Sequence, residues 1–165
     1  MANYANIKYC DVANGTGVRT SIFISGCTHR CKNCFNEVAW DFNYGQELTN
    51  SVIIDLINAC DHEYIDGLTL LGGDPLCGAD NQCASYAICR LFKSRFPSKT
   101  IWLYTGYLYE DIKDLPVMEY VDVLVDGPYI DEKRNLMLKF RGSENQRLID
   151  VRATRKNNQL TLLNI

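Results

Sequence analysis

Three cysteines, Cys27, Cys31 and Cys34, lie within eight residues, directly after the apolar run at residues 21–26. Thiolates this close in sequence can bind one metal centre. Most cubane iron–sulfur clusters use four cysteines, so a set of three leaves one iron without a protein ligand. The spacing therefore predicts a [4Fe-4S] cluster with one open coordination position.

The same loop also offers ligands for zinc. Cys27, His29, Cys31 and Cys34 together could surround a tetrahedral ion. Structural zinc sites usually divide their ligands between two pairs separated in sequence, and four ligands within eight residues would strain the backbone. The loop favours the cluster over zinc, and both alternatives stay open at this point.

Five further cysteines are scattered along the chain: Cys10, Cys60, Cys77, Cys83 and Cys89. In a chain of 165 residues with 47% hydrophobic residues and no secretory leader, they favour a reducing, cytoplasmic compartment over a disulfide scaffold. We interpret them as small apolar side chains of the core. A second metal site made of Cys77, Cys83 and Cys89 is the alternative, although its six-residue spacings match no familiar ligand loop.

Length and charge restrict the function further. The chain is long enough to bury a core and is expected to form a single domain over residues 1–165. A formal net charge of −3 shows no basic surface for phosphates, so no nucleic acid is expected as a partner. No apolar run approaches the ~20 residues of a spanning helix, so no membrane association is expected.

Apolar runs that end in glycine or an acidic residue alternate with segments of helical periodicity. The expected strands cover residues 19–26, 67–75, 99–106 and 120–127. The expected helices cover residues 49–60, 80–96 and 108–113, and residues 35–46 are expected to be irregular. Two short runs, at residues 148–151 and 160–163, flank an expected hairpin turn at residues 155–158.

Alternating strands and helices predict an α/β fold with parallel strands and right-handed crossovers. A complete eightfold barrel takes about 250 residues, so we predict an incomplete parallel (βα) barrel of about five or six strands. Ligands of such folds bind at the carboxyl ends of the strands. Cys27, Gly72, Thr105 and Asp126 all lie at those ends.

A second motif, Gly72-Gly-Asp-Pro75, closes one expected strand. Adjacent glycines let main-chain groups approach a ligand, although such strings are also ordinary turn material. Combined with the cysteine loop, the motif resembles the radical S-adenosylmethionine enzymes. The string Asn14-Gly-Thr-Gly-Val-Arg19 resembles the glycyl-radical activases within that superfamily, with Thr16 in place of the usual proline.

Further strings narrow the resemblance over roughly residues 10–150. They are Phe35-Asn36, Ile101-Trp102, Thr105-Gly106-Tyr107, Val121 to Gly127 and Arg141 to Gln146. In this order, and in so short a chain, they resemble the activases of anaerobic ribonucleoside-triphosphate reductases. The resemblance implies a fold of the radical S-adenosylmethionine type.

The resemblance also implies a set of cofactor contacts. Cys27, Cys31 and Cys34 would hold the [4Fe-4S] cluster, and S-adenosylmethionine would chelate the fourth iron through its amino and carboxylate groups. Gly72 and Gly73 would approach its methionine moiety. Its adenine would contact Asn33, Cys34 and Phe35. Asn33 occupies a position where many members of the superfamily carry an aromatic residue.

Other implied roles belong to the turn and to later strand ends. Asp74 and Pro75 would fix the turn. Thr105 and Asp126 would bind the ribose or a monovalent cation. Tyrosines 107, 109 and 129 and residues 134–147 are candidates for a docking surface. His29 and His62 are expected to be solvent-facing loop residues, because the implied chemistry needs no acid or base.

The implied reaction is reductive cleavage of S-adenosylmethionine, with an electron from a flavodoxin-like donor. The resulting 5′-deoxyadenosyl radical would remove hydrogen from a glycine of the partner, an anaerobic ribonucleoside-triphosphate reductase. Two alternatives remain open. One is activation of another glycyl-radical enzyme, such as pyruvate formate-lyase, and the other is a non-catalytic iron–sulfur or zinc module.

Overall fold

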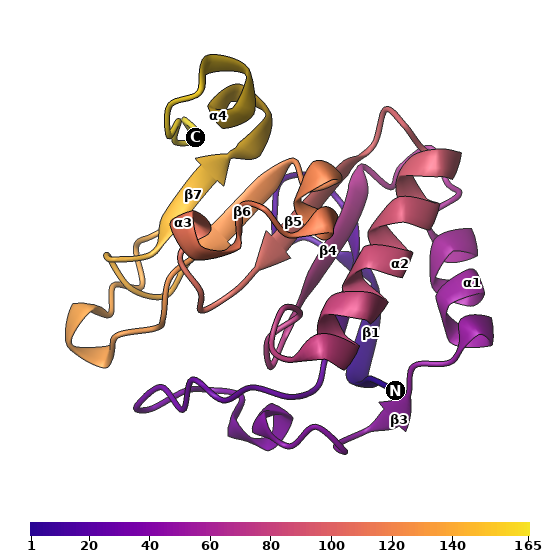
Figure 1. The fold of residues 1–165 in the computed structure, drawn as a ribbon, viewed down its shortest axis with the longest axis horizontal. Helices are drawn as coiled ribbons and strands as arrows, with labels where there is room; N and C mark the ends of the chain where they lie inside the picture. Colours follow the sequence, from indigo (N-terminus) through magenta and orange to yellow (C-terminus); the bar gives the residue numbers. More distant parts are fainter.

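The computed structural model describes residues Met1–Ile165, which form a seven-stranded sheet and four α-helices (Figure 1). The strands are β1 (Asn3–Asp11), β2 (Arg19–Ile24), β3 (Gln46–Glu47), β4 (Gly67–Gly72), β5 (Thr100–Tyr104), β6 (Val123–Asp126) and β7 (Arg147–Asp150). The α-helices are α1 (Asn50–Ala59), α2 (Ala79–Arg95), α3 (Tyr109–Ile112) and α4 (Val151–Asn157). None of these helices combines the length and the apolar character needed to cross a bilayer.

The strands follow the order β3-β1-β2-β4-β5-β6-β7 across the sheet. The four central strands, β2, β4, β5 and β6, pair in parallel, which confirms the predicted α/β class. The sheet has seven strands instead of the predicted five or six, and it is a mixed open sheet in which the predicted parallel barrel is not seen. Antiparallel strands β1, β3 and β7 extend the parallel centre on both sides and leave β3 and β7 at the two edges of an open sheet.

The differences from prediction lie near the two ends of the chain. No strand was expected at β1, because only Asp11 of this strand is buried and no apolar alternation marks it. The hairpin turn expected at residues 155–158 is wrong, because α4 occupies this region. Asp150 caps α4 by accepting a hydrogen bond from the Ala153 N–H, and Asn158 ends it with a left-handed φ of 51°.

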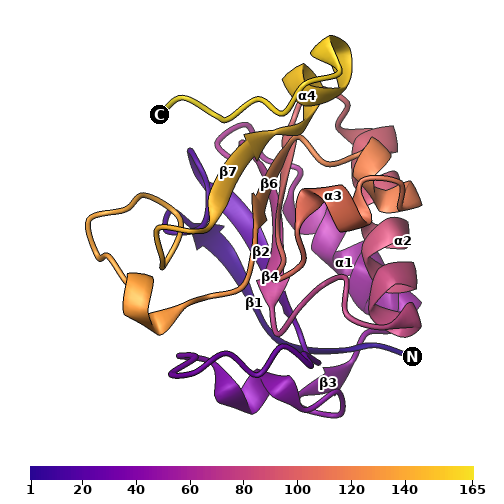
Figure 2. The ribbon, with the colours of Figure 1, turned by 60° about the vertical axis from the view of Figure 1, so that its left-hand side comes forward.

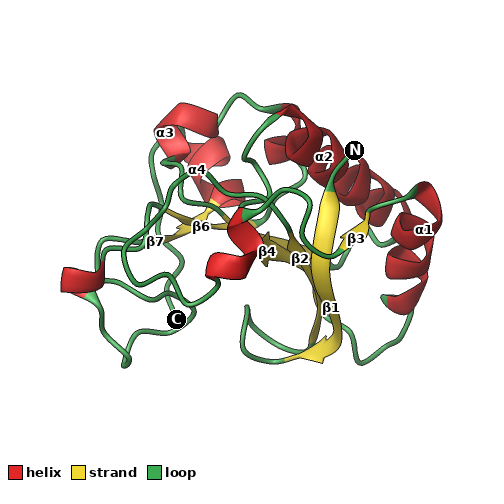
Figure 3. Cartoon of the chain, turned by 90° about the horizontal axis from the view of Figure 1, so that it is seen from below, coloured by secondary structure: helices red, strands yellow, loops and turns green.

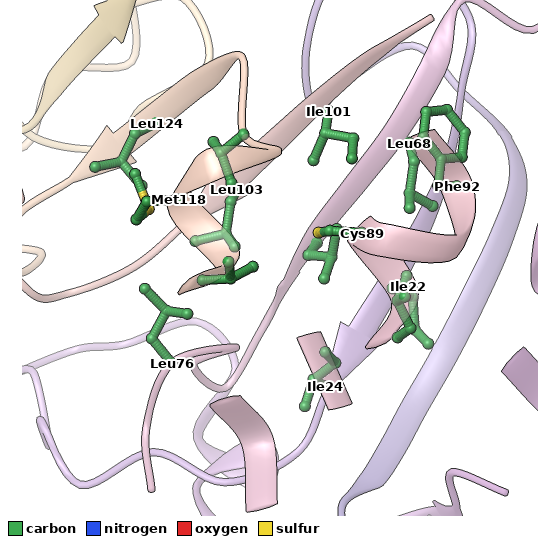
Figure 4. Packing of buried hydrophobic residues seen from close by; sticks show 14 of the residues in the cluster. Ile22, Ile24, Leu68, Leu76, Cys89, Phe92, Ile101, Leu103, Met118 and Leu124 are labelled. Carbon is green, nitrogen blue, oxygen red and sulfur yellow. The ribbon is translucent and has the colours of Figure 1, made fainter. Parts of the chain in front are cut away.

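One face of the sheet forms the main core. Successive side chains of a strand point to opposite faces, so Ile22 and Ile24 of β2 share a face with Leu68 of β4 and Leu103 of β5 (Figure 4). Helix α2 packs on them through Phe92 and its neighbours. Figure 2 shows α1, α2 and α3 together on this side of the sheet, and Figure 3 shows the same layer from below.

The opposite face of the sheet carries a smaller apolar cluster and a buried arginine. Trp102, Val123, Val125 and Leu148 form the cluster. The Arg19 side chain is fully buried beside Trp102, and its guanidinium donates to Thr69 Oγ1, to Thr100 Oγ1 and to main-chain oxygens. Burial lowers the pKa of Arg19 to about 10, so the group stays charged at neutral pH.

The glycines of the string at residues 14–19 make room for protein atoms. A Cβ atom on Gly15 would lie 2.7 Å from Arg19 Cδ, and one on Gly17 would lie 2.1 Å from Asp66 Oδ2. Arg19 begins β2, so this string lies at the opposite end of that strand from the cysteine loop. Its close approach therefore serves the packing of the sheet.

The scattered cysteines are all free thiols, but they do not share one environment. Cys60, Cys77 and Cys89 are buried as expected, whereas Cys10 and Cys83 are exposed, so the core interpretation is wrong for these two. Cys77 and Cys89 are buried and Cys83 is exposed, so the structure does not favour the alternative of a metal site made of these three thiols.

Candidate functional site

A pocket lies at the carboxyl ends of the parallel strands, on the face opposite the main core. Phe23, Leu71, Tyr104 and Val125 form its wall, and each alternates in its strand with a residue of the main core. The pocket brings together seven of the residues predicted for the site: Cys27, Cys31, Cys34, Phe35, Gly72, Gly73 and Thr105. Four others do not line it: Asn33, Asp74, Pro75 and Asp126.

The cysteine loop follows β2, and three of its residues have a left-handed backbone conformation. Gly26 has φ of 106°, Arg30 has φ of 53° and Asn33 has φ of 58°. The N–H groups of Gly26 and Cys27 donate to the carbonyl groups of Ala39 and Trp40. The segment that follows the loop therefore folds back and fixes its base.

The three thiols of the loop differ in burial. Cys27 is buried, and Cys31 and Cys34 are half-buried. Burial raises the pKa of Cys27 to about 11 and also raises the pKa of Cys31. A metal centre binds the thiolate form, so binding at this loop would release protons and would be weaker at low pH.

The donor set fits a cluster better than a single zinc ion. Cys27, Cys31 and Cys34 line one pocket, and no fourth cysteine does. His29, the fourth ligand that zinc would need, has its Nε2 atom 2.7 Å from Asp74 Oδ2, so only its Nδ1 atom could bind an ion. Three cysteines without a fourth suit a polynuclear group with an open corner.

The turn after β4 lies directly against the base of the cysteine loop. The Gly73 N–H donates to the carbonyl group of Ile24, and the Asp74 N–H donates to that of Gly26. A Cβ atom on Gly73 would lie 2.5 Å from the Ala39 oxygen and 2.8 Å from the Gly26 oxygen. The glycine is thus required by neighbouring main chain as well as by any ligand in the pocket.

Asp74 holds the turn from the inside of the protein. Its carboxylate is buried and accepts hydrogen bonds from the Leu76 N–H, the Gly106 N–H and Thr105 Oγ1. This geometry agrees with the predicted role of Asp74 in fixing the turn. It also engages the Thr105 hydroxyl, which donates to Asp74 at 3.0 Å.

The prediction that His29 is a solvent-facing loop residue is wrong. Its side chain is only 17% exposed, and its ring is bonded to Asp74 and stands edge-on to Tyr107. Both partners stand in motifs that the sequence analysis identified, the histidine in the cysteine motif and the aspartate in the glycine motif. Their spacing in the sequence did not indicate that the two side chains would be in contact. His62 is exposed, as expected.

Asn33 and Phe35 lie at the outer rim of the loop. Asn33 Nδ2 donates to Asp131 Oδ2 at 2.8 Å, and this bond is the main cause of the lowered pKa of Asp131. The Phe35 side chain is 96% exposed and lines both the pocket and the adjoining groove beside Tyr129. An exposed ring at this position is available to contact a ligand or a partner.

Asp126 is placed apart from the pocket. Its fully buried carboxylate accepts the Tyr109 N–H at 2.8 Å and pairs with Arg147 at 2.5 Å. These contacts join the end of β6 to α3 and β7 and favour a structural role. Several pocket residues were not predicted as site residues, among them His29, Trp40 and Tyr104. Tyr104 precedes Thr105 at the end of β5, and that strand-end position was the available signal.

Comparison with known proteins shows the family of this chain. Residues 13–149 match the family described as a 4Fe-4S single cluster domain. The anaerobic ribonucleoside-triphosphate reductase-activating protein of Enterobacteria phage T4 is 45% identical over 148 residues, which cover 88% of this chain and 92% of the phage protein.

Bacterial proteins of the same name are also similar. That of Vibrio cholerae is 39% identical over 150 residues, covering 87% of this chain and 95% of its own length. That of Escherichia coli K12 is 34% identical over 148 residues, covering 87% of this chain and 96% of its own length. The chain therefore belongs to the family of anaerobic ribonucleoside-triphosphate reductase-activating proteins and carries a single-cluster 4Fe-4S domain.

Proposed function

We propose that this protein activates an anaerobic ribonucleoside-triphosphate reductase as a radical S-adenosylmethionine enzyme. The observation that carries the proposal is the pocket in which Cys27, Cys31 and Cys34 surround one space beside Gly72 and Gly73, without a fourth cysteine. When bound, the cluster and S-adenosylmethionine supply a 5′-deoxyadenosyl radical that removes a hydrogen atom from a glycine of the reductase.

The residues of the chain hold and shield this chemistry. Cys27, Cys31 and Cys34 would ligate the cluster, and S-adenosylmethionine would bind through its amino and carboxylate groups where the cluster has no protein ligand. The main chain of Gly72 and Gly73 supports its methionine moiety, as close backbone approach permits. The walls of the pocket are largely apolar and would limit the access of water to a reactive intermediate.

Other parts of the site have more distant roles. Asp74 and Pro75 hold the turn, and the Phe35 ring, together with the main chain of Asn33 and Cys34, would contact the adenine. Thr105 lines the pocket and would contact the ribose. Asp126 is not assigned a monovalent cation, because Arg147 already neutralises that carboxylate.

We further propose that residues 1–165 work as a single domain whose open sheet is the incomplete barrel of the radical S-adenosylmethionine type. The free state of all eight cysteines supports a reducing, cytoplasmic location. An external one-electron donor such as flavodoxin would supply the electron.

The direct test is activation in vitro. The protein is reconstituted anaerobically with iron and sulfide, reduced, and incubated with S-adenosylmethionine and an anaerobic ribonucleoside-triphosphate reductase. Electron paramagnetic resonance should then show a glycyl radical, with one S-adenosylmethionine cleaved per radical formed. A reductase whose radical glycine is replaced by alanine is the control and should give no such signal.

Two results would redirect the proposal. A radical formed on pyruvate formate-lyase but not on the reductase would assign the activase to another glycyl-radical enzyme. A protein that binds one zinc ion without a brown chromophore, or whose reduced cluster leaves S-adenosylmethionine intact, would be a non-catalytic module.

A further inference from the structure

His29 lies between two of the cysteines, and separate contacts fix its ring. The Nε2 atom is 2.7 Å from Asp74 Oδ2, and the ring centroid is 4.6 Å from that of Tyr107, edge-on. The His29 side chain is 17% exposed and that of Asp74 only 1%. A side chain held on two sides in this way restricts the loop that carries it.

The acceptor of this hydrogen bond is the centre of a small network. A carboxylate can only accept, so the Nε2–H group of His29 donates to Asp74. The same carboxylate accepts from Thr105 Oγ1 and from the Gly106 N–H. One buried group therefore joins the cysteine loop, the turn after β4 and the end of β5, and the His29 contact spans 45 positions of the sequence.

The end of β5 is also shaped to receive the imidazole ring. A Cβ atom on Gly106 would lie 2.6 Å from Cδ2 of His29 and 2.7 Å from its Nε2. A Cβ atom at such a distance would displace the ring. The absence of a side chain at Gly106 thus leaves the space that the ring occupies. This steric fit is a second observation, separate from the hydrogen bond to Asp74.

We propose that His29 is a positioning residue that holds the cysteine loop in register with the Gly72–Gly73 turn. The loop carries the cluster thiols and the turn supports the methionine moiety, so a fixed distance between them sets how the bound cofactor meets the open iron. The identity of the two bound groups, the cluster and S-adenosylmethionine, rests on the proposed function. The role of His29 in fixing the loop against the turn does not depend on that function.

The first test uses the metal-free protein, so that it does not depend on any cofactor. Amide hydrogen exchange is compared among the native protein, His29→Ala, His29→Gln and His62→Ala. We expect exchange of residues 27–34 and 72–77 to rise about tenfold in His29→Ala. Glutamine places an amide N–H at a similar reach and should restore protection to within about threefold of the native protein.

His62 is the matched control, because it is exposed and its only aromatic contact is with Tyr64. His62→Ala should leave exchange in both segments unchanged. Equal exchange in His29→Ala and His62→Ala would overturn the proposal.

A second test fills the space at Gly106. Gly106→Ala should speed exchange of the cysteine loop in the native background but have little further effect in His29→Ala, where the ring is gone. Equal effects in both backgrounds would contradict a ring seated at Gly106. This variant and His29→Gln also serve if His29→Ala does not fold.

A third test uses the cluster-loaded protein and separates cofactor geometry from cluster assembly. His29→Ala should keep the iron content per chain of the native protein while the dissociation constant for S-adenosylmethionine rises about tenfold. An unchanged dissociation constant would refute the effect on the cofactor. If the native protein itself binds no S-adenosylmethionine, the proposed function fails, and the exchange measurements still decide the role of His29.

Discussion

At the scale of single residues, the three cysteines of the loop are not interchangeable with the other five. We expect Cys27→Ala, Cys31→Ala or Cys34→Ala to lower cleavage of S-adenosylmethionine at least about 100-fold, because a lost thiolate leaves the cluster underligated. Iron and sulfide analysis with a cleavage assay would measure this.

The matched control for the cysteine variants is Cys83→Ala. Cys83 is an exposed cysteine of α2 that does not line the pocket. The Cys83→Ala variant should keep the iron content and activity of the native protein. Native cleavage by any of the three loop variants would refute the assigned ligands.

Gly73 is a second residue whose replacement has a defined consequence. An added Cβ would meet the Gly26 and Ala39 oxygens at 2.8 and 2.5 Å, so main chain beside Cys27 would have to move. We expect Gly73→Ala to destabilise the protein by about 2 kcal/mol and to lower iron content together with cofactor affinity. Urea unfolding and iron analysis would check both effects. A variant with native stability and iron content would show that the loop can move to accommodate the added Cβ without loss of stability.

At the scale of elements, the pair of Asp126 and Arg147 joins β6, β7 and α3. Arg147 also donates to Glu110, and this bond is the main cause of the lowered pKa of Glu110. We expect Asp126→Asn to cost about 3 kcal/mol of unfolding free energy, because it leaves a half-buried guanidinium poorly paired. Chemical denaturation would measure the loss.

Glu110→Gln is the control for this pair, because its carboxylate is 56% exposed and such a bridge contributes under about 1 kcal/mol. The Glu110 contribution is present above its ordinary pKa of 4.5 and should be lost as pH falls through its lowered value. A larger effect in Glu110→Gln than in Asp126→Asn would reverse our assignment of the stronger partner.

At the scale of the whole molecule, the main core lies apart from the three cysteines of the loop. The main core contains 25 buried residues and none of the three loop cysteines. We therefore expect the metal-free protein to keep the far-ultraviolet circular dichroism of the loaded protein and to unfold cooperatively. Removal of iron should reduce protection from hydrogen exchange only partly and only in residues 27–45, where the contacts of His29 remain. A metal-free chain without secondary structure would place this protein with the small domains that fold only around their metal.

The sequence predicted those features that depend on neighbours along the chain. The spacing of Cys27, Cys31 and Cys34 specifies a ligand loop because the three thiols are close whatever the fold. The central strands and helices were predictable because alternation of period 2 and of 3.6 residues reflects burial of one face. Thr49 was likewise predictable as the cap of α1, since its hydroxyl accepts from the Val52 N–H only three residues away.

Only the tertiary structure decided the contacts between distant segments. His29 meets Asp74 across 45 positions, and Asp126 meets Arg147 across 21, so neither pairing has a local signature. The antiparallel strand β1 is mostly exposed, and the region expected to form a hairpin turn is α4, which follows β7 directly where that strand pairs with β6. Which polar groups share a buried site is set by packing, because a buried donor or acceptor must find its partner wherever the fold brings one.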